Sequence, residues 1–319
     1  MKKLICLLMV VSLVCVANAA TIRYQNSGDW FDVDLSDGNG WQGGLVPGAA
    51  DVARANWGGW TGNTITLSDA APDITRFQLG VDESGTLVVN NGGSITSTAD
   101  SKVGNNNWVT GKLVINAGGT VTNNSWFGVA TGNGGTKAAG YDPSNPTATW
   151  GPTYGVVEIN GGVLDIVSHL WAATGGTHAS SGGAPTSRAT ISINAGGVIN
   201  VGGNLGLGTI NASTPSAGGG IAILNVNDGG LLNLHYWDDL NSIMDGSAIW
   251  IEGSGKVIVG GNRLTAVENY AAVGKIQTTW EDGITATYDA LTDQTTIIPE
   301  PATMALLGLG ALALLKRRK

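Results

Sequence analysis

One short pattern recurs along the middle of the chain and constrains its fold more than any other feature. An alternating apolar segment is followed by an asparagine, a pair of glycines and a second apolar segment. The asparagines of the five clearest copies are Asn90, Asn116, Asn160, Asn194 and Asn227. They are spaced 26, 44, 34 and 33 residues apart, and a sixth copy with Glu252 in the asparagine position follows 25 residues later. Imperfect repeats of this length predict a solenoid, in which each unit buries its apolar face against its neighbours.

The apolar runs within each copy are too short for helices and alternate as strands do. A third short run follows the second in several copies, starting at Phe127, Trp171 and Leu205. The chain also contains 50 glycines, which disfavour helix interiors. We therefore expect an all-β fold, a parallel β-helix of about six or seven coils over 65–264. An N-terminal cap is expected over 20–64 and capping strands over 265–298.

The Asn-x-Gly-Gly corner has a structural interpretation. A strand that turns sharply into the next strand needs residues that tolerate positive φ, and Gly and Asn do so at low steric cost. In a stack of such corners, each asparagine amide would hydrogen-bond the coil above or below it. We therefore interpret the five asparagines as a structural ladder, not as ligands of a bound molecule.

The longer spacings come from three insertions, at 132–155, 175–188 and 210–220. Each lies between a third strand and the next first strand, so all three would project from one edge of the solenoid. Loops on a rigid scaffold commonly carry binding residues. This edge is one hypothesis for a functional face, and the alternative is that tolerant corners have accumulated polar filler.

The two ends of the chain read as targeting segments. Residues 1–19 have the features of a secretory signal peptide: Lys2 and Lys3, an apolar stretch, and a small-residue cleavage site at 17–19. The alternative is a retained N-terminal anchor. Both cysteines, Cys6 and Cys15, lie in this segment. We therefore expect a mature protein without disulfides or thiol ligands.

At the other end, Pro299, Glu300 and Pro301 are followed by 14 uncharged residues. The chain then closes on the basic cluster Lys316, Arg317, Arg318 and Lys319. As a helix the uncharged stretch would be about 21 Å long, short of a hydrocarbon core of about 30 Å.

These three elements, in this order, resemble the PEP-CTERM sorting signal. The resemblance implies an exosortase-type protease as partner, transient residence in the inner membrane through the C-terminal helix, and delivery to the cell surface or the extracellular polysaccharide matrix. A permanent single-span anchor is the alternative. The Gly- and Asn-rich body, in turn, resembles the β-solenoids of autotransporter-type passengers.

The charge of the body limits the classes of partner. Residues 20–298 contain ten basic and 23 acidic residues, a net charge of −13. A surface of this charge repels nucleic acids and anionic membranes. We expect no nucleic-acid partner.

Parallel β-helices are scaffolds for polysaccharide lyases and hydrolases, so each polar cluster is a candidate active site. The densest is Asp238-Asp239, beside His235 and Trp237. Glycoside hydrolysis needs two carboxyl groups facing one sugar, whereas adjacent strand residues point to opposite faces. We assign no catalytic residue.

No metal or cofactor site is predicted either. The three histidines, at 169, 178 and 235, lack metal-ligand spacing. Asp32, Asp34 and Asp37 depart from the spacing of a calcium loop and fit an edge strand with outward acids.

Three tryptophans occupy similar places in their repeats: Trp126, Trp171 and Trp237. Aromatic residues at one corner of a solenoid usually seal its core, and the alternative is a platform on which sugar rings stack. Taken together, the sequence predicts an exported, non-enzymatic structural or binding protein associated with extracellular polysaccharide. A carbohydrate-active lyase or hydrolase is the second hypothesis. An adhesin or ice-binding module is the third, weakened by the scattered placement of threonines.

Overall fold

The strands form three sheets, named here by the order in which a coil visits them. Sheet 1 contains β2 (Gly28–Asp29), β5 (Asn63–Leu67), β7 (Gly85–Val89), β10 (Thr110–Asn116), β13 (Thr153–Asn160), β16 (Ser187–Ile193), β19 (Ile221–Val226), β21 (Ala248–Ile251) and β23 (Ile276–Gln277). Sheet 2 contains β8 (Ser94–Ser97), β11 (Thr120–Asn123), β14 (Val163–Ile166), β17 (Val198–Val201), β20 (Leu231–Leu234), β22 (Lys256–Gly260), β25 (Gln294–Pro299) and β24 (Ile284–Asp289). Sheet 3 contains β3 (Gly40–Trp41), β1 (Thr21–Gln25), β4 (Val52–Arg54), β6 (Arg76–Leu79), β9 (Ser101–Val103), β12 (Phe127–Val129), β15 (Leu170–Ala172) and β18 (Leu205–Leu207).

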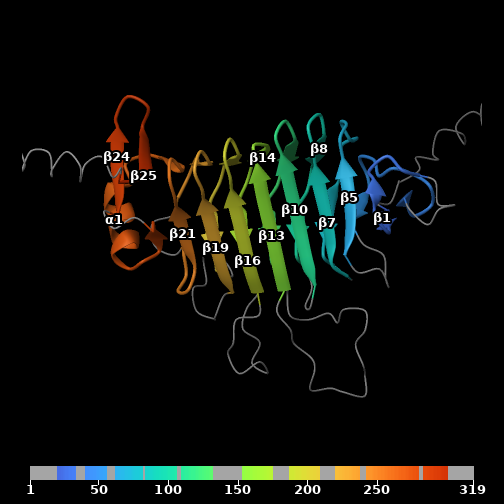
Figure 1. The fold of residues 1–319 in the computed structure, drawn as a ribbon, viewed down its shortest axis with the longest axis horizontal. Coiled ribbons are helices and arrows are strands. Elements are labelled where there is room, and N and C mark those ends of the chain that lie inside the picture. Colours follow the sequence, from blue (N-terminus) through green and yellow to red (C-terminus); the bar gives the residue numbers. More distant parts are fainter. Residues whose placement is uncertain are drawn as a thin grey trace, which may run out of the picture.

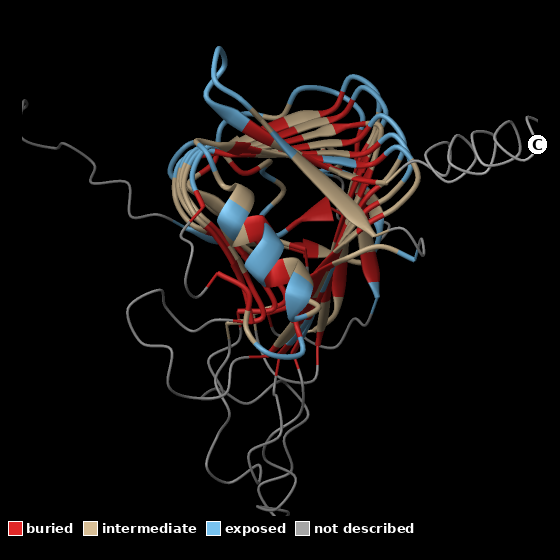
Figure 2. Ribbon diagram, turned by 90° about the vertical axis from the view of Figure 1, so that its left-hand side faces the viewer, coloured by how far each residue is buried: buried red, intermediate tan, exposed pale blue. Residues whose placement is uncertain are grey.

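These elements come from a computed structural model that describes residues 20–33, 40–55, 62–81, 83–105, 109–131, 153–174, 187–208, 220–237, 242–279 and 283–300. The strands lie side by side along one axis, from β1 at one end to β24 and β25 at the other (Figure 1). The runs β7–β9, β10–β12, β13–β15 and β16–β18 each place one strand in each sheet. Viewed along the axis, the three sheets enclose a three-sided core (Figure 2). The chain is thus an all-β protein with parallel sheets and a β-helix-like architecture.

The register within sheet 1 explains why the apolar residues recur. Leu113 pairs with Leu87 on one side and with Val157 on the other, and the same file continues through Ile191 and Leu224. All of these side chains are buried, while the residues between them face outward. Alternation in these strands therefore builds a continuous apolar column inside the stack.

The two glycines of the corner meet different requirements. The first has positive φ, as in Gly118 at 77° and Gly196 at 73°, a conformation that side chains disfavour. The second lies against the previous coil: a Cβ on Gly197 would sit 2.5 Å from the carbonyl oxygen of Ile159. The glycine pair thus provides both the turn and the close approach of neighbouring coils.

Aromatic side chains close the N-terminal end of the core. Trp41 packs edge-on against Tyr24 and Trp30, with ring centroids 4.9 and 4.7 Å apart, and its Nε1 donates to the Trp30 carbonyl at 2.6 Å. All three rings are buried. The segment expected as a cap also supplies parallel strands, since β1 pairs in parallel with β4, and β4 with β6.

The C-terminal end differs from the expected set of strands. The helix α1 (Leu264–Ala272) lies across the end of the stack (Figure 2) and buries Val267 and Tyr270 against it. β23 continues sheet 1, because it pairs in parallel with β21. β24 and β25 do form an antiparallel hairpin, and β25 adds antiparallel to β22.

Candidate functional site

The Pro-Glu-Pro segment begins inside the folded body. Pro299 is the last residue of β25, buried and paired with Ile284 of β24. The next residue, Glu300, donates its backbone N–H to the Gly283 carbonyl at 3.0 Å, and its carboxylate accepts from Thr285 Oγ1 at 3.1 Å. The motif is therefore continuous with the last hairpin of the stack.

The remainder of the expected sorting signal, Pro301, Lys316, Arg317, Arg318 and Lys319, lies outside the described residues, as does the expected leader 1–19. Within the described parts of the chain, no helix is both long and apolar enough to span a bilayer.

The structure places the five repeat asparagines in one file along the corner between sheets 1 and 2. Their side-chain amides form a chain of donor–acceptor bonds from coil to coil. The bonds run from Asn116 to Asn90 at 2.8 Å, from Asn160 to Asn116 at 3.3 Å, from Asn194 to Asn160 at 2.6 Å and from Asn227 to Asn194 at 2.7 Å. In the sixth copy, Glu252 instead accepts two hydrogen bonds from Thr279, one from its N–H and one from its hydroxyl.

A second polar file, which the sequence interpretation missed, lies on the outer face of sheet 2. Asn200 donates to Asp165 at 2.6 Å, and Asn233 donates to Asn200 at 2.7 Å. The three residues are in register on β14, β17 and β20. Asp165 comes five residues after its ladder asparagine, and Asn200 and Asn233 come six residues after theirs. This near-constant offset was the signal that could have found the file.

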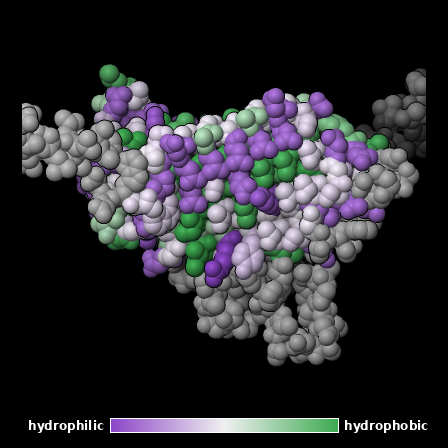
Figure 3. Space-filling view, in the orientation of Figure 1, coloured by the Kyte–Doolittle hydropathy of each residue, from purple (hydrophilic) through white to green (hydrophobic). Residues whose placement is uncertain are grey.

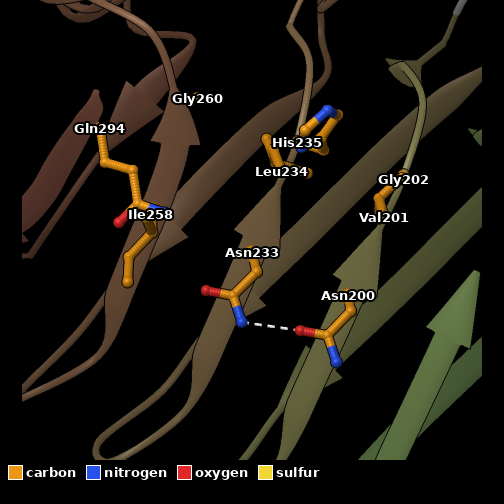
Figure 4. A pocket seen from close by; sticks show the side chains of 9 residues that line it. All are labelled: Asn200, Val201, Gly202, Asn233, Leu234, His235, Ile258, Gly260 and Gln294. Carbon is orange, nitrogen blue, oxygen red and sulfur yellow. Dashed lines mark hydrogen bonds between the residues drawn. The ribbon is translucent and has the colours of Figure 1, made fainter. Parts of the chain in front are cut away.

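The second file opens into a groove of about 400 Å³. Figure 4 shows Asn200 and Asn233 on neighbouring strands, with Ile258 on the next strand, Gln294 beyond it and His235 at the upper end. Three amide side chains therefore converge on one outer surface. Because an amide both donates and accepts hydrogen bonds, this lining can hydrogen-bond a polar ligand.

The groove continues over the corner beyond His235. A second hollow shares His235 and Gln294 with the first and adds Tyr236, Arg263 and Asp293. The Arg263 guanidinium lies 5.6 Å from the Tyr236 ring centroid, and Tyr236 is 50% exposed. Asp293 accepts from Tyr288 Oη at 2.9 Å, a bond that is the main cause of the raised pKa of Tyr288. We use the name sheet 2 groove for the surface formed by both hollows.

The three tryptophans singled out in the sequence have different environments. Trp237 is fully buried and stacks on Tyr270 of α1 at 5.2 Å, so it seals the core. Trp126 and Trp171 are partly exposed on the side of sheet 3. The structure thus separates one core residue from two that keep part of their rings at the surface.

The other candidate residues contribute little chemistry. Asp34, Asp37, His178, Asp238 and Asp239 lie outside the described residues, as do most of the three insertions. His169 accepts the Asn204 N–H at Nδ1 and packs on Trp171. Among the residues described, no cluster of three His, Cys, Asp or Glu side chains could hold a metal ion.

The described geometry defines a class: a β-helix-like protein whose last strand runs directly into a C-terminal Pro-Glu motif. The family model for the PEP-CTERM protein-sorting motif matches residues 298–319. This match supports an exported protein that exosortase recognises and sorts to the cell surface. No curated protein and no solved structure matches the chain.

Proposed function

We propose that this protein is an exported structural rod that binds extracellular polysaccharide after exosortase has sorted it to the surface. The observation that carries the proposal is the continuity between β25 and the sorting motif at 298–319. No linker separates the rod from the segment that the protease recognises. The precursor would therefore be held at the membrane by its C-terminal end, with the side faces of the rod exposed to the matrix.

The sheet 2 groove supports polysaccharide as the ligand. Asn200, Asn233 and Gln294 offer hydrogen-bonding amides, and Tyr236 offers an exposed aromatic ring beside them. Amides suit sugar hydroxyls, and an aromatic ring suits the apolar face of a sugar. The groove is open along its length, as binding to the middle of a polymer requires.

The groove supports binding better than hydrolysis. Among its described lining residues, Asp293 is the one carboxylate, and it already accepts a hydrogen bond from Tyr288. Most glycoside hydrolases use two carboxyl groups that flank the scissile bond. We therefore propose recognition without turnover, and a polysaccharide lyase or hydrolase remains an outcome that the test below can reveal.

The sorting half of the proposal is tested by mass spectrometry of the surface-located protein from cells with and without the protease. We expect the basic end, Lys316–Lys319, to be absent when the protease is present and retained when it is deleted. A surface-located protein that keeps these residues in protease-positive cells would contradict sorting and favour a permanent anchor.

The binding half is tested by co-sedimentation of the full chain with the extracellular polysaccharide of the producing bacterium. We expect Tyr236→Ala to weaken binding roughly five- to tenfold, the usual contribution of one aromatic contact. Tyr154→Ala is the matched control, since Tyr154 is 40% exposed on β13 of sheet 1. Equal binding by both variants and the unaltered chain would contradict the groove as the binding site. Release of shortened or unsaturated sugars would establish an enzyme.

A further inference from the structure

A second surface, on sheet 3, combines cations and aromatic rings in one file. Arg23 of β1 is in register with Arg54 of β4, which is in register with Gln78 of β6 and then Lys102 of β9. The file continues through Gly128 of β12 to Trp171 of β15. We call Arg23, Arg54, Gln78, Lys102, Trp126 and Trp171 the basic–aromatic strip.

The basic half of the strip is unusual for so acidic a body. Four of the ten basic residues in 20–298 lie on strands of sheet 3: the strip residues Arg23, Arg54 and Lys102, and Arg76 beside them on β6. Neighbouring strands are about 4.8 Å apart, so these cations repel one another across one to three strand spacings. These cations therefore give sheet 3 a local positive charge that favours an anionic ligand.

Interactions at Lys102 show how the cations are held. Burial lowers the pKa of Lys102, Asp100 raises it, and nearby Arg76 lowers it further. Asp100 is also engaged by Ser125, which donates to its carboxylate at 2.7 Å. Arg54 Nε donates to Gln78 Oε1 at 2.9 Å, which fixes the guanidinium along the file.

The aromatic half begins where the cations end. The Lys102 ammonium lies 5.2 Å from the Trp126 ring centroid. The Trp126 ring covers Gly128, because a Cβ at Gly128 would lie 2.8 Å from Trp126 Cζ3. In the next coil Trp171 pairs with Gly128 and packs at 5.6 Å against His169. Two indole rings therefore extend the file of cations without a break.

We propose that the basic–aromatic strip binds an acidic polysaccharide, a polymer of carboxylated or sulfated sugars that lies along the axis of the rod. Arg54 and Lys102 would pair with its anionic groups, and Trp126 and Trp171 would stack on its rings. Five strand spacings separate Arg23 from Trp171, about 24 Å, which accommodates several consecutive sugars.

This inference rests on the proposed function and deepens it, because it specifies the charge of the polymer. The strip and the sheet 2 groove lie on different sheets. The groove offers neutral amides and one arginine, Arg263, whereas the strip offers a row of cations. Variants at one surface therefore leave the other intact.

The test measures binding of the full chain to polygalacturonate, an acidic polymer, and to dextran, a neutral one. We expect the double variant Arg54→Gln/Lys102→Gln to bind polygalacturonate at least about tenfold more weakly, and binding by the unaltered chain to weaken as salt rises. The matched control is Arg188→Gln/Lys256→Gln, which removes two cations from sheets 1 and 2. Dextran binding should be the same for all three proteins.

A charge-preserving variant, Arg54→Lys/Lys102→Arg, guards against a loss that reflects misfolding alone, and it should retain most of the binding. Equal losses in the test and control pairs, or no loss in either, would overturn the inference. If Tyr236→Ala reduces binding to the native polysaccharide while the strip variant does not, the proposed function stands and the inference that the strip binds the polymer is wrong. If neither polymer nor the native polysaccharide binds, the proposed function itself fails.

Discussion

At the scale of single residues, the asparagine file converts a side chain of low strand propensity into a contact between coils. Each internal amide, such as that of Asn194, donates to the previous asparagine and accepts from the next. No other side chain of similar size can do both with the same geometry, because aspartate cannot donate and leucine can do neither. Such ladders also stabilise other parallel stacks of strands. We therefore propose that the file holds the coils in register.

Replacement of one ladder residue tests this role. Asn194→Ala should lower the free energy of unfolding by about 2 kcal/mol, because it removes the donor to Asn160 Oδ1 and the acceptor of Asn227 Nδ2. Asn225→Ala is the control: Asn225 makes one longer bond, to Ser192 at 3.3 Å, and should lose less than about 1 kcal/mol. Urea unfolding followed by circular dichroism measures both. Losses of equal size would mean that an asparagine in the file stabilises the fold no more than Asn225, which lies outside it.

At the scale of elements, the final hairpin connects the fold to the sorting motif. β24 is mostly half-buried and holds the end of β25 through the Ile284–Pro299 pair and the contacts of Glu300. A protease that recognises the motif in an extended form must first separate this end from β24. The stability of two or three contacts in the hairpin would then set the rate of processing.

The variant Thr285→Val removes the hydroxyl that donates to Glu300. We expect processing of the C-terminus to become roughly threefold faster, since one part-buried hydrogen bond contributes about 0.5–1 kcal/mol. The control is Thr292→Val, which removes a similar bond to Asp289 at the other end of the hairpin. Pulse-labelling and mass spectrometry follow the loss of the tail. The hypothesis is wrong if both variants are processed at the rate of the unaltered chain, or if Thr292→Val gives the larger effect.

The elements also show what the sequence can and cannot predict. The repeated strands are local: alternation and the glycine corner occur within about ten residues, so their type and register can be read directly. The helix α1 buries only Val267 and Tyr270. Two apolar residues three positions apart are too weak a periodic signal to predict a helix among strands. The groove depends on Gln294, which reaches it because β25 folds back on β22. That antiparallel pairing is long-range, and no local pattern encodes it.

At the scale of the whole molecule, the length of the body is set by its number of coils, because each coil adds one strand spacing. Polar and apolar side chains are interspersed over the outer face of sheet 1 (Figure 3), and Lys112 and Glu158 of neighbouring strands form an ion pair at 2.8 Å. The inward residues recur with a period of two within most strands of sheet 1. Coils should therefore be interchangeable as long as this period is preserved.

A pair of deletions tests this interchangeability. Removal of 158–191 joins Val157 to Ser192, the residue that follows its own register partner, and removes one coil in register. We expect a folded, cooperative protein that is shorter by about 4.8 Å. Removal of 158–190 leaves one extra residue, so Ile191 turns outward and Ser192 inward. This control should be insoluble or much less stable by thermal unfolding. Similar behaviour of the two deletions would show that register does not govern the fold.

A column of interchangeable parallel coils also has the geometry of a fibril seed, because each open end presents strand edges to the next copy. Here both ends of the column are capped. Tyr24, Trp30 and Trp41 fill one mouth of the core, while Trp237 and α1, followed by a hairpin of reversed strand direction, fill the other. The capped ends therefore oppose end-to-end association, so that many exported copies of a repetitive β protein can stay separate, each with a fixed number of coils.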